Sequence, residues 1–181
     1  MKSKVYIETS IISYLVNRPS RDLILAAHQQ VTHEWWNNRR PKFDLYASQA
    51  VMDEASEGDE EAAQLRLKVL RGIPLLELRV EALDLAEMIV RHKALPKKAS
   101  QDALHIAVAA IYGMDYLLTW NCKHIANAVI RRKLQKLPLN RITNFQQFVH
   151  LTNSWENNHV DRSHCRRNTP NSPSPCRKAP L

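Results

Sequence analysis

Four polar side chains stand at positions from which they could share one metal ion. Glu8 and Asn121 each directly follow a short apolar run that is typical of a strand. Glu54 lies on the apolar side of a predicted helix, and Asp102 opens a helix that is apolar almost all round. Oxygen ligands favour Mg²⁺ or Mn²⁺ over zinc. Such an ion, on a basic protein, suits the hydrolysis of phosphodiester bonds.

The elements that must position these residues alternate along the chain. Short runs rich in β-branched or aromatic residues predict strands at 5–7, 44–48, 74–78, 116–120 and 139–143. Helical spacing of apolar residues predicts helices at 10–15, 22–36, 49–55, 61–70, 80–95, 100–112, 124–137 and 144–151. Strands that are separated by helices require crossover connections. The sequence therefore predicts an α/β fold, a three-layer α/β/α sandwich with a mostly parallel central sheet.

In such a sheet, ligands bind outside the carboxyl ends of the strands. Glu8 and Asn121 are expected at that edge, and Glu54 and Asp102 are expected on helices that begin there. Three carboxylates gathered in a small volume repel one another, and burial adds to the energetic cost. A cation between them removes most of that cost, so the cluster itself predicts a bound divalent ion.

The 181 residues carry a net charge of +8 and are 44% apolar, which fits one domain. We predict this domain at 1–152. The remainder, 153–181, contains four prolines and no apolar periodicity, which predicts a disordered basic tail. Residues 151–181 hold five Lys/Arg and two Asp/Glu, a net charge of +3, so residues 1–150 carry the remaining +5 of the net charge. The body is basic in its own right.

Several protein classes are disfavoured by the composition. Apolar runs stay well short of the ~18 residues that a membrane helix requires, and the first residues lack an export signal. The three cysteines show no CxxC spacing, which argues against a disulfide framework and a thiolate zinc site. We expect a cytoplasmic protein with no membrane contact.

Each candidate also has a purely structural interpretation. Asp102 could complement the positive end of its helix, an effect worth about 0.3–1 kcal/mol. Glu8 could be an exposed side chain at a strand end, followed by Thr9 and Ser10 as natural helix N-caps. Glu54 lies in an acidic stretch, and such stretches are usually solvated faces.

Three blocks of sequence resemble PIN-domain proteins, the fold of VapC-type toxins. The blocks are VYIETSIISYL, ASQAVMDEASEGD and SQDALHIAVAAIYGMDYLLTWNCKHIAN, in that order over about residues 3–150. The resemblance implies that the family's four site positions correspond here to Glu8, Glu54, Asp102 and Asn121. It also implies an endoribonuclease that depends on Mg²⁺ or Mn²⁺ and is the toxin of a type II toxin–antitoxin pair. RNA is then the substrate, a small antitoxin protein the partner and a homodimer the expected state.

Two positions depart from the family's pattern. Glu8 stands where aspartate is usual, and Asn121 replaces the aspartate of the T-x-D turn. An amide can offer its carbonyl oxygen to a metal, but the site loses one negative charge. We expect three charged ligands, weaker metal binding and reduced activity. The alternative is a PIN-like module that is catalytically weakened or inactive and binds RNA or protein. A phosphatase or receiver domain is disfavoured, because the first strand is followed by a single acid.

Six further residues are secondary candidates for substrate contact or for orienting water: Thr9, Ser10, His105, Thr119, Lys123 and His124. The two threonines and the serine either orient a metal-bound water or make local capping and strand-end hydrogen bonds. The histidine on the apolar helix faces the substrate or hydrogen-bonds within the core. The last two residues follow Asn121 at the expected mouth of the site, where phosphate would lie.

Overall fold

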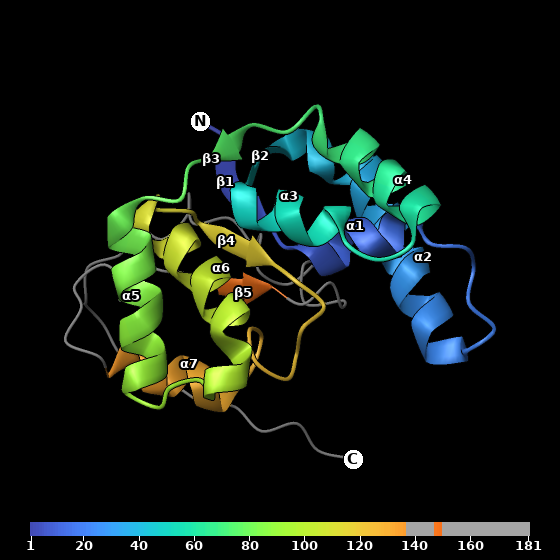
Figure 1. The fold of residues 1–181 in the computed structure, drawn as a ribbon. Coiled ribbons are helices and arrows are strands. Elements are labelled where there is room, and N and C mark those ends of the chain that lie inside the picture. Colours follow the sequence, from blue (N-terminus) through green and yellow to red (C-terminus); the bar gives the residue numbers. More distant parts are fainter. Residues whose placement is uncertain (137–146, 150–181) are drawn as a thin grey trace, which may run out of the picture.

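A parallel sheet of five strands forms the centre of the protein (Figure 1). The structure is a computed structural model that describes residues 1–136 and 147–149. The strand order is β3-β2-β1-β4-β5, and every adjacent pair is parallel. The strands are β1 (Ser3–Ile7), β2 (Phe43–Ser48), β3 (Leu75–Leu76), β4 (Tyr116–Leu118) and β5 (Gln147–Val149). The predicted three-layer α/β/α sandwich is confirmed.

Helices connect consecutive strands and cover the sheet. In Figure 1, α5 and α6 lie side by side at one side of the molecule, and α1, α3 and α4 gather at the other. The α-helices are α1 (Thr9–Val16), α2 (Leu23–Asn38), α3 (Gln49–Ser56), α4 (Glu60–Leu70), α5 (Val80–Arg91), α6 (Ser100–Ile111) and α7 (Ala128–Gln135). Two short 3₁₀ helices, η1 (Arg40–Lys42) and η2 (Lys97–Ala99), precede β2 and α6.

The predictions for the last part of the chain differ from the structure. The strand expected at 139–143 lies outside the described residues. The helix expected at 144–151 is wrong at 147–149, where the chain forms β5 and pairs with β4. Phe145 and Phe148 have helical spacing, but a strand at the sheet edge is selected by its neighbour, which local spacing does not reveal.

The last described helix also begins later than its apolar pattern suggests. The pattern predicted a helix from His124, whereas α7 starts at Ala128. Its N-cap is Asn127, whose side chain accepts hydrogen bonds from two backbone N–H groups of the first turn. Residues 121–127 therefore form a loop after β4. The predicted boundary at 152 and the predicted tail at 153–181 lie outside the described residues.

The core runs through the middle of the sheet and through α6. In β1, Val5, Tyr6 and Ile7 are fully buried, as expected for a strand that is covered on both faces. Almost every residue of α6 from Ala103 to Ala110 is buried as well. Among the described helices, none is long and apolar enough to cross a membrane.

The strand order reverses between β1 and β4. From β1 the chain goes to β2 and β3 on one side, and later to β4 and β5 on the other. The register pairs Ile7 with Leu118, and the backbone N–H of Glu8 donates to the carbonyl of Leu118 at 3.1 Å. Ligand sites of open parallel sheets lie at such a switch point, outside the carboxyl ends of the two strands.

Shortening a core side chain in α5 should destabilise the protein, whereas the same change on the surface should not. Ile89 is fully buried, and Ile24 on α2 is 70% exposed. We expect Ile89→Val to lower the free energy of unfolding by about 0.5–1.5 kcal/mol. Ile24→Val should change it by less than about 0.5 kcal/mol. Urea denaturation of the two variants checks this, and equal losses would contradict the placement of α5.

Candidate metal and nucleic-acid site

Glu8 leaves β1 at the switch point and turns its carboxylate back toward the start of α1. The residue is 8% exposed and serves as the N-cap of α1. Its carboxylate accepts hydrogen bonds from the backbone N–H of Ser10 at 3.1 Å, the hydroxyl of Ser10 at 2.5 Å and the hydroxyl of Thr119 at 2.7 Å. The predicted caps, Thr9 and Ser10, are instead the first two residues of the helix. The carboxylate is therefore held in one orientation by Ser10, which follows β1, and by Thr119, which follows β4.

Glu54 reaches the same place from α3. Its carboxylate accepts hydrogen bonds from the hydroxyl of Thr9 and from Nε2 of His105, the latter at 3.1 Å. Burial raises the pKa of Glu54, but hydrogen bonds from His105, Thr9 and Gln101, together with the charge of His105, outweigh burial. The net effect is a pKa below the ordinary glutamate value. Glu54 is thus ionised at neutral pH.

His105 is 1% exposed and connects Glu54 to the core. Its Nδ1 lies 2.8 Å from the hydroxyl of Tyr6, which in turn lies 2.7 Å from the hydroxyl of Ser48. An ionised carboxylate can only accept, so Nε2 carries a hydrogen. Burial, above all, raises the pKa of Tyr6, so its phenol keeps its proton. The four side chains form a buried chain of hydrogen bonds that fixes the carboxylate of Glu54.

Glu8, Glu54 and His105 converge on one point. Each offers a ligand atom, and the three atoms all lie within 4.8 Å of one another. The buried carboxylate of Glu8 and the half-buried carboxylate of Glu54 repel each other at this separation, so a divalent cation between them is favoured. The oxygen donors suit Mg²⁺ or Mn²⁺. His105 suits the supporting role of a donor that orients a ligating carboxylate. The residues present fit the predicted ion.

Asp102 and Asn121 form a second group beside the first. The carboxylate of Asp102 accepts from the amide nitrogen of Asn121 and from Nδ1 of His124, both at 2.8 Å. The carbonyl oxygen of Asn121 accepts from the backbone N–H of His124 at 3.1 Å. This N–H can only donate, which fixes the orientation of the amide. The carbonyl oxygen of Asn121, which the sequence offers as a metal ligand, accepts a hydrogen bond from the backbone in this arrangement.

Short contacts join the two groups. The hydroxyl of Thr119 donates to Glu8 and accepts from the backbone N–H of Asn121 at 2.8 Å. On the other side, Gln101 hydrogen-bonds Glu54, and it is the neighbour of Asp102 in the first turn of α6. All four predicted site residues therefore lie at one edge of the sheet. Asp102 is nevertheless outside the trio that lies within 4.8 Å.

The secondary candidates divide into buried and accessible residues. His105 and Thr119 are buried and donate hydrogen bonds to Glu54 and Glu8, which agrees with the structural alternative given for each of them. Thr9 and Ser10 are half-buried and donate to the two glutamates. These hydroxyls hold carboxylates in place. At the mouth of the site, Lys123 is exposed and His124 is half-buried.

Sequence reasoning missed Tyr6, Ser48 and Gln101. Tyr6 carried a usable signal, because a tyrosine in the middle of a strand that is apolar on both sides must find a buried partner for its hydroxyl. Ser48 ends β2 next to the start of α3, a position equivalent to that of Glu8 after β1. Nothing in the sequence pairs either residue with His105, since the hydrogen bond from Tyr6 spans 99 positions.

Removing the imidazole should raise the pKa of Glu54. In His105→Leu, burial still raises this pKa, while the largest opposing contributions are lost. The lowered pKa in the unmodified protein contributes stability above the ordinary glutamate pKa, and this stability is lost as pH falls through the lowered value. In the variant the pKa of Glu54 is no longer lowered, so this contribution is absent and the protein should be less stable at neutral pH. Carboxyl NMR titration in EDTA measures the pKa, with the exposed His33→Leu as control. An unchanged pKa in His105→Leu would contradict the network.

Comparison with solved structures places the fold. VapC20 of Mycobacterium tuberculosis, a sarcin-ricin loop cleaving toxin, superimposes with a TM-score of 0.53 at 18% sequence identity. The match covers 67% of this chain and 93% of that chain. No family model matches the sequence, and no curated protein matches it significantly. The resemblance of the three sequence blocks is thus confirmed at the level of the fold, which this chain shares with VapC20.

Proposed function

We propose that this protein is a metal-dependent endoribonuclease that hydrolyses RNA phosphodiester bonds, and that it is the toxin of a type II toxin–antitoxin pair. The observation that carries the proposal is the convergence of Glu8, Glu54 and His105 at the switch point between β1 and β4. The fold shared with VapC20, itself a toxin that cleaves the sarcin-ricin loop, supports it.

In this proposal Glu8 and Glu54 hold a Mg²⁺ or Mn²⁺ ion, with Asp102 as the third carboxylate of the site. When bound, such an ion acidifies water and neutralises charge that develops on the phosphate. His105 and Thr9 keep Glu54 ionised and oriented, and Ser10 and Thr119 orient Glu8 through hydrogen bonds. Because these donors belong to buried or half-buried elements, the carboxylates need little reorganisation when the substrate binds.

A second function is supported by the hydrogen bonds that the site residues already make with the protein. Glu8 accepts three hydrogen bonds from the protein, and Asn121 brings an amide nitrogen rather than a carboxylate to Asp102. Both features lower the demand for a cation. A PIN-like module with weak or absent catalysis, which binds RNA or protein, would have such a site.

The proposed partners follow from the proposed toxin role. We expect an RNA substrate in the cytoplasm, a small antitoxin that covers the site, and a homodimer. Co-expression with a small protein encoded next to this one, followed by purification of a stable complex that no longer cuts RNA, would support the antitoxin.

The experiment that separates the two functions is a metal titration coupled to RNA cleavage. The unmodified protein should cut RNA with Mn²⁺ or Mg²⁺ and stop when EDTA is added. Asp102→Asn should cut RNA at least about tenfold more slowly than the unmodified protein, since the substitution removes a charge beside the ion. Its melting temperature should stay close to that of the unmodified protein, because the amide oxygen still accepts from Asn121. RNA binding without cleavage at millimolar metal would favour the binding module.

A further inference from the structure

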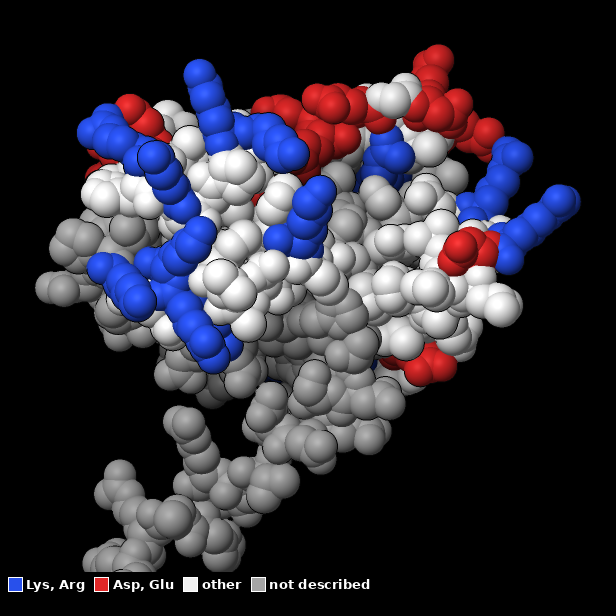
Figure 2. Space-filling model, turned by 90° about the horizontal axis from the view of Figure 1, so that it is seen from below, with Lys and Arg blue, Asp and Glu red and all other residues white. Residues whose placement is uncertain are grey.

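Positive charge is concentrated on one side of the candidate site. Residues 91–136 contain nine lysines and arginines against two aspartates. Figure 2 shows lysines and arginines gathered toward one side of the face that it displays. We define the basic strip as six exposed cations of this segment: Lys93, Lys97, Lys98, Lys123, Arg132 and Lys133.

The basic strip starts at the site carboxylates. Lys97 and Lys98 lie in η2, which leads directly into the first turn of α6 with Asp102. Lys123 lies in the loop after β4, next to His124, whose ring contacts Asp102. Two separate segments next to Asp102 thus carry cations. One is η2, which precedes its helix, and the other is the loop whose His124 contacts its carboxylate.

The rest of the basic strip follows on α7. The side chain of Asn127, the N-cap of α7, donates to the carbonyl of Lys123 at 3.2 Å. Farther along this helix, Nζ of Lys133 lies 3.5 Å from the carbonyl of Lys93, in the turn after α5. These contacts join the loop after β4, α7 and the turn after α5, so the cations lie on segments that contact one another.

The opposite side of the site is acidic. Residues 53–61 contain six aspartates and glutamates and no lysine or arginine. In addition to Glu54, which belongs to the site, the acidic ridge consists of five exposed residues of α3, α4 and their connection: Asp53, Glu57, Asp59, Glu60 and Glu61. Figure 2 shows acids in a band along one edge of the same face. The site carboxylates therefore lie between surfaces of opposite charge.

We propose that RNA enters the site from one side only, with its phosphates along the basic strip, while the acidic ridge keeps the backbone away from α3 and α4. The proposal rests on the proposed function. Electrostatic interactions act over about 8 Å at physiological salt, so charges that border the site act on the phosphates next to the scissile bond.

The first test measures how RNA affinity depends on salt. A fluorescent single-stranded RNA is titrated with the full chain in EDTA, which prevents cleavage. Each single-strand phosphate contact contributes about 0.7 to the slope of log affinity against log salt. Lys97→Gln/Lys98→Gln should therefore lower the slope by about 1.4, and Arg132→Gln/Lys133→Gln should lower it similarly.

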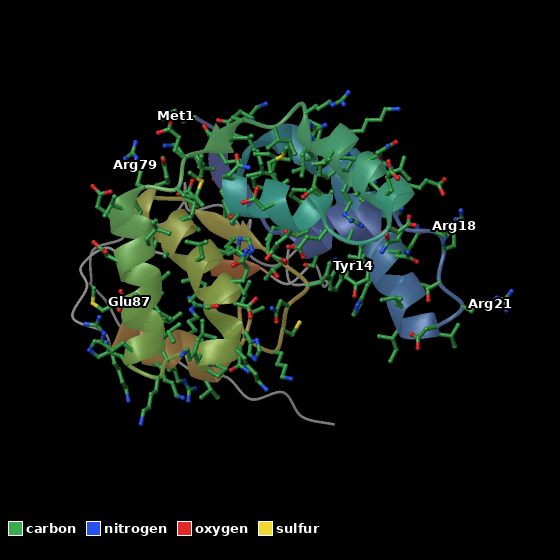
Figure 3. All side chains as sticks on the ribbon, in the orientation of Figure 1. Met1, Tyr14, Arg18, Arg21, Arg79 and Glu87 are labelled. Atoms are coloured by element: carbon green, nitrogen blue, oxygen red, sulfur yellow. The ribbon has the colours of Figure 1, made fainter. Side chains whose placement is uncertain are left out.

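The matched control removes two positive charges elsewhere. Arg18 and Arg21 are exposed, and in Figure 3 they lie across the molecule from Glu87 on α5. Arg18 contacts Glu61 at 3.4 Å in a solvent-exposed ion pair, which contributes little to stability. Arg18→Gln/Arg21→Gln should leave the slope unchanged. An equal loss in the control and in the strip variants would overturn the proposal, as would unchanged slopes in the strip variants, which would assign the strip to another ligand such as an acidic protein.

The second test uses the RNA. After the cleavage site is mapped with Mn²⁺, the RNA is shortened from either end. Trimming on one side of the scissile bond should weaken binding, and trimming on the other side should not. Equal effects from both ends would contradict one-sided entry. If the protein never cleaves RNA but the salt slopes behave as expected, the proposed function fails and the strip stands as an RNA-binding surface.

Discussion

Glu54→Gln should reduce RNA cleavage by about 100- to 1000-fold and leave the fold intact, a loss typical of removing one preorganised electrostatic group from an active site. The change removes the charge that faces Glu8 but keeps the shape of the side chain. The amide oxygen still accepts from Thr9 and His105, so the buried network from Ser48 through Tyr6 is retained. Cleavage with Mn²⁺ and the melting temperature are the two measurements.

The matched control is Glu81→Gln. Glu81 is exposed in the first turn of α5 and belongs neither to the site nor to the acidic ridge, so the variant has the same change in net charge without touching either. It should cut RNA as fast as the unmodified protein. If Glu54→Gln retained full activity while it melted normally, the assignment of Glu54 to the metal site would be refuted.

Asn121→Asp should make the stability of the protein depend on metal. The amide nitrogen of Asn121 donates to Asp102 at 2.8 Å. In the variant, two carboxylates face each other there and a hydrogen bond is lost, which should cost about 1–3 kcal/mol without metal. For a protein of this size, that corresponds to a drop in melting temperature of roughly 2–4 °C per kcal/mol.

Adding Mn²⁺ should reverse this loss. The restored charge should tighten metal binding about tenfold, equivalent to 1.4 kcal/mol, and a ligand that binds only the folded state raises its stability. Thermal melts with EDTA and with Mn²⁺ measure the difference. Asn37→Asp, an exposed substitution on α2, is the control and should show no metal dependence beyond that of the unmodified protein. A variant as stable in EDTA as the unmodified protein would contradict the observed contact.

The sequence alone predicts the edge at which the site lies, because strand ends are readable. Glu8 and Asn121 follow buried apolar runs, and the parallel order brings those ends together. The partners of each side chain are not readable in the same way. Tyr6 on β1 hydrogen-bonds His105 on α6, and the amide of Asn121 is oriented by the backbone N–H of His124. Both depend on tertiary packing, which places residues that are distant or irregular in the chain.

The same limit explains why the predicted convergence holds for two of the three carboxylates and not for the third. Glu8 and Glu54 converge as expected, because Glu8 directly follows β1 and Glu54 lies on α3, the helix that follows the neighbouring strand β2. Asp102 is at the predicted edge but pairs with Asn121 and His124 instead. The missing fourth carboxylate is the physical reason: an amide donates to Asp102, whereas a carboxylate would compete with it for a cation. The local substitution thus changes the contacts of its neighbour.

The central claim is that Glu8 and Glu54 hold a divalent cation at the switch point between β1 and β4. Crystals of the protein grown with Mn²⁺ test it through the anomalous signal of the metal. The account predicts a peak within coordination distance of both carboxylates, and its absence in crystals of Glu54→Gln. A Mn²⁺ peak elsewhere, with the two glutamates still hydrogen-bonded only to protein groups, would contradict it.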